Sequence, residues 1–303
     1  MYSERLTKLL LSLLGGIYLV EYFQDGLYTD LGMLGFNKKT TTRRRLTFIV
    51  FILGATLASF FLGSLSFPKN ITFQNLWGVA SVCLSGIAGI LAIIKLVTRR
   101  KNKYVFIAVA FSGIALLEGY SLFVPLPLTS LVWMISRIFL AAYLLLSLKD
   151  WREGEGKQKS LRLRVYIAAA ASTLIIIALF SLLPTYDPYN PIGPFGRPIE
   201  LTAVILFGIA AIGYYTKGYW EFKYFEFWLV LSLIAAFFSQ VYMSFSQTYF
   251  DSMFWGAIIF KNLGYILALV GLLESTWAAF REVEAEKKYL AGHTKGEAYL
   301  KGE

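Results

Sequence analysis

The chain has 303 residues, of which 57% are hydrophobic and 16% are charged, and its mean hydropathy is +0.59. Ordinary globular chains contain about 45–50% apolar and about 25% charged residues, so most of this chain is expected to lie in lipid, which excludes a separate water-soluble catalytic domain. The formal net charge of +10 would suggest nucleic acid in a soluble protein, but in a membrane protein it must be assigned loop by loop.

The first 45 residues are predicted to form an N-terminal interfacial segment and a basic cytoplasmic linker. Leu6 to Val20 is short for a span, which needs about 20 apolar residues. Leucines recur on one helical face of this stretch, and Lys8 and Ser12 fall on the other. This pattern favours an amphipathic helix lying in the inner interface. A short, tilted ninth span is the alternative.

Eight later segments are long enough to cross a bilayer. They lie at about 46–66, 76–97, 104–124, 128–148, 164–183, 199–216, 227–246 and 253–273. The predicted fold class is therefore all-α: a polytopic integral membrane bundle of about eight helices, with a transmembrane domain over residues 46–273. Residues 274–303 are predicted to form a cytoplasmic helical extension and polar tail.

The loops between these segments alternate in charge. Basic residues gather at 38–45, 99–103, 149–164 and 217–223, and after residue 280, whereas the other loops contain only Lys69 and Arg197 as cations. Because positive loops stay in the cytoplasm, a multi-pass protein of the cell membrane with both termini cytoplasmic is predicted. The basic excess is mostly this orientation signal, so the lipid bilayer is an expected partner and nucleic acid is not.

Residue types that carry catalysis are scarce. Cys83 is the only cysteine and His293 the only histidine, and the GxSxG, HExxH and P-loop patterns are absent. We therefore predict no catalytic residues, no metal site, no cofactor and no enzymatic activity.

Polar residues within the predicted spans are the candidate functional residues, because an ionisable group in the hydrocarbon is costly unless it is paired or hydrated. They are Glu118, Arg137, Gln240, Lys261 and Asn262. At 1.5 Å per residue, Glu118 and Gln240 lie about 9 Å from the outer face, and Arg137 and Lys261 about 12 Å. We call these five residues the polar layer. It is predicted to be either a ligand pocket for an anionic or polar molecule, or an ion-pair network that fixes helix register.

Three further residues, Arg197, Glu200 and Asp251, are predicted to lie at the outer rim above the polar layer. Two of them have a structural alternative. Glu200 follows Pro198 at a helix start, where a carboxylate is favoured by the helix dipole, and Asp251 is a candidate N-cap.

The second half of the chain resembles the membrane-embedded sensor domains of the MASE type, which precede bacterial and archaeal histidine kinases and diguanylate cyclases. The similar residues include Arg197-Pro198-Ile199-Glu200, Phe207 to Tyr214, Phe225 to Leu233, Asp251, Phe254, Ala257, Lys261, Gly264-Tyr265 and Gly271-Leu272, together with Leu117 to Tyr120 and Arg137. The chain departs from the family at Ile258, where such domains often carry a histidine. The family normally continues from its last helix into an output module, whereas this sequence continues for about 30 residues past the last predicted span. We therefore expect either a stand-alone sensor-like protein or the membrane part of a longer one.

This resemblance implies a sensor or receptor-like protein that acts through a cytoplasmic or membrane protein partner, or as a homo-oligomer. Residues 274–290 keep a helical pattern with mixed charge, which suits either a relay to such a partner or a simple anchor for the last span. A small transporter or channel subunit, and a structural subunit of a larger membrane complex, are the alternatives from other functional classes.

Overall fold

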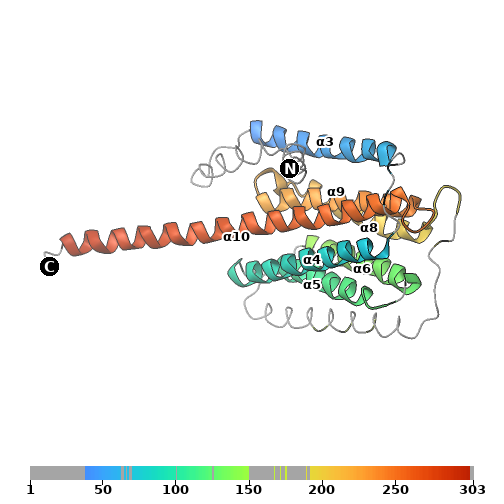
Figure 1. Ribbon diagram of the computed structural model, residues 1–303. Coiled ribbons are helices and arrows are strands. Elements are labelled where there is room, and N and C mark those ends of the chain that lie inside the picture. Colours follow the sequence, from blue (N-terminus) through green and yellow to red (C-terminus); the bar gives the residue numbers. More distant parts are fainter. Residues whose placement is uncertain are drawn as a thin grey trace, which may run out of the picture. The chain divides into compact units, whose positions relative to one another are not determined.

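The computed structural model describes residues 38–62, 70–99, 101–124, 126–149 and 192–300, together with a few single positions between them (Figure 1). Within these residues the regular structure is helical. The α-helices are α3 (Lys38–Leu62), α4 (Ile71–Arg99), α5 (Lys103–Ser121), α6 (Leu126–Leu148), α8 (Leu201–Thr216), α9 (Tyr224–Phe245) and α10 (Ser252–Leu300). Two 3-10 helices, η1 (Pro198–Glu200) and η2 (Tyr219–Glu221), precede α8 and α9. The predicted all-α fold class is confirmed.

Seven helices in the described part are long and apolar enough to cross a membrane. They correspond to seven of the eight predicted spans, so the chain is a multi-pass membrane protein. The predicted span at 164–183, and the amphipathic or spanning segment at 6–20, lie outside the described residues apart from three helical positions, Ile167, Ala171 and Ile175.

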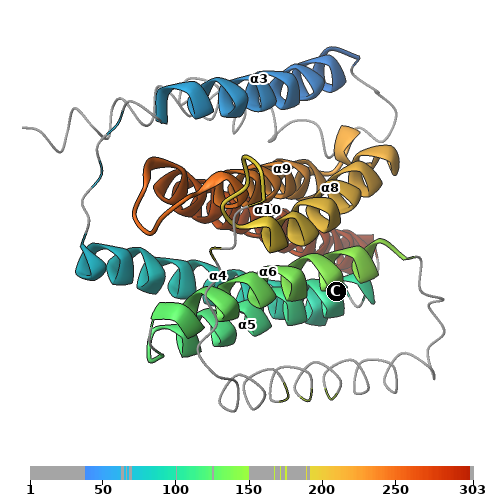
Figure 2. The same ribbon diagram turned by 90° about the vertical axis from the view of Figure 1, so that its right-hand side faces the viewer.

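Six helices pack in a closed ring. In the region that runs from Arg44 onward, neighbouring pairs are α4 with α5, α5 with α6, α6 with α8, α8 with α9, α9 with α10, and α10 with α4. Figure 2 shows α8, α9 and α10 forming one layer against α4, α5 and α6. Of the candidate spans, α5 and α9 are the most enclosed: 72% of the residues in the apolar stretch of each helix are buried. Glu118 on α5 and Gln240 on α9 are accordingly enclosed by protein and do not face lipid.

α3 is held to the ring by large side chains. Phe48 makes edge contacts with Tyr215 and Trp220, and the Tyr242 hydroxyl donates to the Ala55 carbonyl. Only 17% of the residues in the apolar stretch of α3 are buried. Its exposed side chains include Phe60, which is 75% exposed. Such a surface is stable only in lipid or against another apolar surface.

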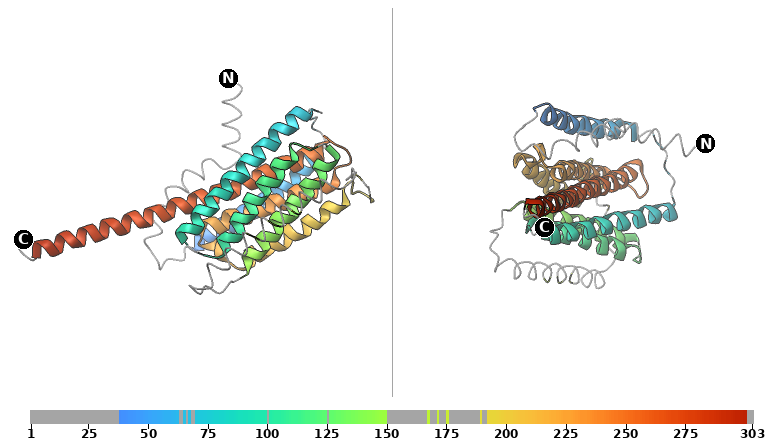
Figure 3. Two further views of the ribbon diagram at one scale, coloured as in Figure 1. Left: turned by 90° about the horizontal axis from the view of Figure 1, so that it is seen from below. Right: turned by 90° about the vertical axis from the view of Figure 1, so that its left-hand side faces the viewer.

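α10 runs unbroken for 49 residues, about 73 Å at 1.5 Å per residue. Its candidate span is Ser252–Ala278, and the helix continues past the ends of α9 and α4 (Figures 1 and 3). Beyond residue 274, α10 is thus a direct continuation of the last span.

Candidate functional site

All five residues of the polar layer are buried inside the ring. The exposed fractions are 1% for Glu118 on α5, 2% for Arg137 on α6, 1% for Gln240 on α9, and 6% and 3% for Lys261 and Asn262 on α10. Four helices therefore contribute to one interior region. The structure brings the predicted residues together, and the contacts below show how each is paired.

Lys261 and Glu118 form the first pair. Lys261 Nζ lies 3.2 Å from Glu118 Oε2, and the Tyr265 hydroxyl donates to Glu118 Oε1 over 2.9 Å. The ammonium also lies 5.8 Å from the ring centroid of Trp133. Both carboxylate oxygens of Glu118 thus accept hydrogen bonds, which a buried ion pair needs if it is to offset its desolvation cost.

Gln240 connects two charges of opposite sign. In the amide orientation that satisfies both neighbours, its nitrogen donates to Glu200 Oε2 over 2.9 Å and its oxygen accepts from Arg137 Nε over 2.9 Å. One amide offers both a donor and an acceptor, so it bridges a carboxylate and a guanidinium that do not touch. This bridge joins α6, α9 and the start of α8.

Arg197 and Glu200 form the second ion pair, with 2.9 Å between Arg197 Nη2 and Glu200 Oε1. Arg197 Nη1 donates to the Met243 sulfur over 2.9 Å, and the Tyr189 ring lies 5.4 Å from the guanidinium. Burial raises the pKa of Tyr189 to about 12, although its hydrogen bond to Ser246 and the nearby Arg197 act in the opposite direction.

The three predicted rim residues divide into two kinds. Arg197 and Glu200 are 2% and 1% exposed and belong to the buried network, so they are not an exposed rim. Glu200 makes no capping hydrogen bond to α8. Asp251 is the N-cap of α10: its Oδ1 accepts from the Phe254 backbone N–H over 2.7 Å, as its structural alternative predicted.

Asn262 has a separate role from the charged residues. Its Oδ1 accepts from the Ser81 hydroxyl of α4 over 2.9 Å, and its Nδ2 donates to the Ile258 carbonyl over 3.0 Å. The carbonyl and the amino group of this amide each have a partner, which makes Asn262 a tie between α4 and α10.

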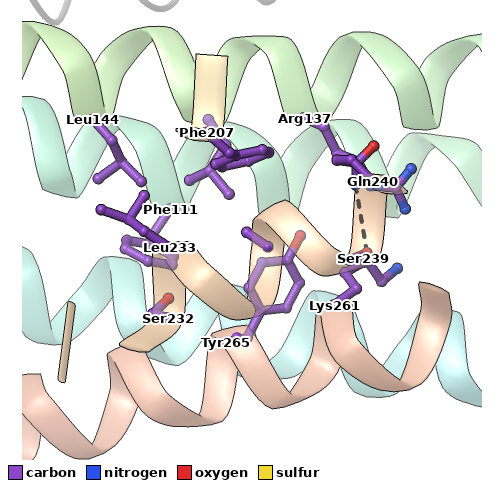
Figure 4. A pocket seen from close by; sticks show the side chains of 13 residues that line it. Phe111, Arg137, Leu144, Phe207, Ser232, Leu233, Ser239, Gln240, Lys261 and Tyr265 are labelled. Carbon is purple, nitrogen blue, oxygen red and sulfur yellow. Dashed lines mark hydrogen bonds between the residues drawn. The ribbon is translucent and has the colours of Figure 1, made fainter. Parts of the chain in front are cut away.

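A small cavity opens beside the charged residues (Figure 4). It offers about 20 Å³ to a water-sized occupant, against the roughly 10–15 Å³ that one water molecule needs. Arg137, Gln240 and Lys261 gather at one end, whereas Leu144, Phe111 and other apolar side chains line the remainder. One water or one ion of similar size therefore fits without rearrangement.

Arg137 is the cation left over. Lys261 is paired with Glu118, and Arg197 with Glu200, but Arg137 has only the Gln240 amide, through Nε. Among the described residues, neither of its buried Nη atoms has a hydrogen-bond partner. The three cations and two carboxylates of this network leave a formal excess of one positive charge. Such an arrangement is able to hold one small anion by charge-assisted hydrogen bonds.

Tyr265 donates a hydrogen bond to Glu118 but was not among the residues predicted for the polar layer. It follows Lys261 by four residues on α10, a spacing that places both side chains on one helical face. This spacing in the sequence indicates that Tyr265 lies beside Lys261 and belongs to the polar layer.

In the described part of the chain, no three His, Cys, Asp or Glu side chains are grouped so that they could hold a metal ion. Comparisons with known proteins add no assignment: no family model, no curated protein and no solved structure matches this chain. The buried network is therefore interpreted from its own geometry.

Proposed function

We propose that the chain is a non-catalytic, multi-pass receptor of the sensor type in the cell membrane, with both termini in the cytoplasm. In this proposal a small anion binds beside Arg137, and its presence changes how α10 packs in the ring. The observation that carries the proposal is the pair of buried Arg137 Nη atoms at the edge of a cavity, for which the described residues provide no hydrogen-bond partner.

Energetics support an occupant for this cavity. Leaving a buried charged donor without a partner costs more than the roughly 1–3 kcal/mol of a neutral group, and lipid gives no access to bulk water. A water molecule satisfies the donors but not the excess charge, whereas a halide ion does both. We therefore favour a chloride-sized anion over water as the occupant.

The same contacts provide a route for signalling. Lys261 and Tyr265, both on α10, line the cavity and bond to Glu118 on α5. An anion that attracts Lys261 weakens its pairing with Glu118, so the occupied and empty states differ in how α10 is held. The continuation of α10 past its span carries that difference toward a cytoplasmic partner. The resemblance to sensor domains points in the same direction.

The proposal is tested by titrating chloride into the purified chain in a neutral detergent, with gluconate maintaining ionic strength. Chloride is expected to raise the thermal unfolding temperature of the wild type in a saturable way, and Arg137→Met is expected to remove the response. Arg45→Met serves as the control, because Arg45 pairs with Glu221 far from the cavity. Equal responses in the wild type and Arg137→Met would refute an anion site at this residue.

A transporter is the second candidate, and one observation favours it. A second cavity lies between α5, α6, α8 and α9, four of the helices that line the first, with its edge at Ser147, one turn beyond Leu144 on α6. Leu144 lines the first cavity and Tyr214 lines the second, and both side chains are buried. Chloride flux in proteoliposomes separates the two functions: the receptor proposal predicts no flux above protein-free vesicles.

A further inference from the structure

The second cavity lies at the lysine-rich end of the ring and has a volume of about 280 Å³. This is close to the lower limit of about 300–1,000 Å³ for small-molecule sites. It is bounded by the start of α5, the ends of α6 and α8, η2 and the start of α9. Its lining residues are Lys101, Asn102, Lys103, Ser147, Leu148, Lys149, Tyr214, Lys217, Tyr219, Lys223 and Glu226.

The charge of this lining is strongly one-sided. Among the residues that the structure describes, it contains five lysines and one carboxylate, a formal excess of four positive charges. Lys103 pairs with Glu226, and Lys217 donates to the Leu148 carbonyl. The excess of positive charge in the described lining favours an anion in this cavity.

Lys223 experiences this imbalance directly. Its pKa is lowered from 10.5, first by desolvation and further by repulsion from Lys103 and Lys101, against the opposing attraction of Glu226. Its Nζ lies 4.6 Å from the Tyr219 ring centroid. An anion in the cavity would stabilise the charged form of Lys223 and so offset both effects.

Asn102 supplies an independent observation. It is 2% exposed and lines the cavity, yet within the described residues neither its amide nitrogen nor its amide oxygen has a hydrogen-bond partner. Asparagine at a helix N-cap normally bonds to the first turn, but the Asn102 side chain makes no such bond to α5. A buried, unsatisfied amide beside five lysines is the arrangement expected where a polar ligand completes the hydrogen bonding.

We infer that this cavity is a binding site for a phosphate group, recognised by Lys101, Lys223 and the Asn102 amide. The volume exceeds that needed by a monatomic ion, and clustered ammonium groups suit the several oxygens of a phosphate. The ligand is either the headgroup of an anionic phospholipid or a soluble phosphorylated molecule. This inference does not depend on the anion site at Arg137.

The variants to compare are Lys223→Gln and Lys101→Gln, each of which removes one ammonium group from the lining, and Asn102→Asp, which adds a negative charge. Lys101 is exposed, so its replacement is tolerated by the fold even if Asn102→Asp is not. Arg45→Gln is the matched control, because it removes one positive charge near η2 without touching the lining.

Two probes distinguish the sources of phosphate. Inorganic pyrophosphate is titrated into the detergent-purified full chain, and its dissociation constant is read from the rise in unfolding temperature. Separately, the chain is extracted from nanodiscs of phosphatidylcholine and phosphatidylglycerol, and the retained lipid is identified by native mass spectrometry. Retention of phosphatidylglycerol alone indicates a lipid headgroup, and binding of pyrophosphate indicates a soluble ligand; either result supports the site.

The site predicts at least a tenfold weaker dissociation constant, or loss of the retained lipid, in Lys223→Gln and Lys101→Gln, with Arg45→Gln unchanged. Three results would overturn it: the wild type binds neither probe, the cavity variants bind as tightly as the wild type, or the Arg45→Gln control loses as much binding as the cavity variants. The last result would mean that the charge at this end of the ring acts only as a diffuse field.

Discussion

Lys261 on α10 donates a hydrogen bond to Glu118 on α5 across 3.2 Å, in the interior of a ring of six membrane-embedded helices. Both side chains are almost fully enclosed, and the second carboxylate oxygen of Glu118 accepts from Tyr265. The pair therefore fixes the rotation of α10 relative to α5, because another register would leave one buried charge without a partner.

This pairing predicts an asymmetric response to mutation. Glu118→Ala leaves Lys261 buried without a carboxylate and is expected to destabilise the chain by about 3–5 kcal/mol. The double variant Glu118→Gln with Lys261→Met removes the charges together and keeps an acceptor for Tyr265, so it is expected to recover at least half of that loss. Thermal unfolding in detergent measures both. A double variant no more stable than Glu118→Ala would show that the loss does not come from the unpaired charge of Lys261.

The Gln240 bridge predicts that replacing the Gln240 amide lowers the stability of the fold. Gln240→Met fills a similar volume but removes both hydrogen bonds, to Arg137 and to Glu200. Because bonds to charged groups contribute about 1.5–3 kcal/mol each, a loss of at least about 2 kcal/mol in unfolding free energy is expected. Ser244→Ala is the control, since its hydroxyl bonds only within α9, to the Val241 carbonyl. Equal stability of Gln240→Met and the control would rule out the bridge.

The loop before η1 gives a steric prediction. A Cβ atom added at Gly196 would lie 2.0 Å from the Ser246 carbonyl oxygen, which is backbone and cannot rotate away, whereas nothing lies within 4 Å of one added at Gly54. Gly196→Ala requires a shift of the backbone at Gly196 or at Ser246 and is expected to cost at least about 2 kcal/mol. Gly54→Ala is expected to fold with unchanged or raised stability. The unfolding temperatures of the two variants test this directly.

The lowered pKa of Lys223 predicts a pH-dependent effect. Because its folded-state pKa lies below 10.5, the unfolded chain binds this proton more tightly. Lys223 therefore reduces stability below its folded-state pKa, and the loss is relieved as the pH rises toward 10.5. Lys223→Met is expected to raise the unfolding temperature at pH 7 and to have little effect near pH 10.5. A benefit that is equal at the two pH values would contradict this explanation.

The lengths of the apolar segments predicted the fold class, and counting depth along each span predicted that Glu118, Arg137, Gln240 and Lys261 lie in one layer. It placed Glu118 and Lys261 within about 3 Å of the same depth, and they are hydrogen-bonded. Depth is only one coordinate, however, and it leaves the rotation of each helix about its axis undetermined. For that reason the sequence did not show that Gln240 connects Arg137 with Glu200, or that Asn262 bonds to Ser81 on α4.

Two other features could not be predicted from the sequence, for physical reasons. Trp255 and Tyr242 lie near span ends, a position typical of interfacial anchors, but both are buried in an aromatic cluster with Phe254. From the sequence, the lysines of the second cavity are predicted only to lie in basic cytoplasmic loops that orient the chain in the membrane. Their convergence depends on how α5, α6, α8 and α9 end beside one another, which no local pattern in the chain specifies.

The central claim is that a small anion occupies the cavity beside Arg137. Crystals grown in bromide, with data collected at the bromine absorption edge, test it most directly. The proposal predicts an anomalous peak within hydrogen-bond distance of the Arg137 Nη atoms, and its absence in Arg137→Met. A wild-type cavity without an anomalous peak, holding only water or nothing at saturating bromide, would contradict it.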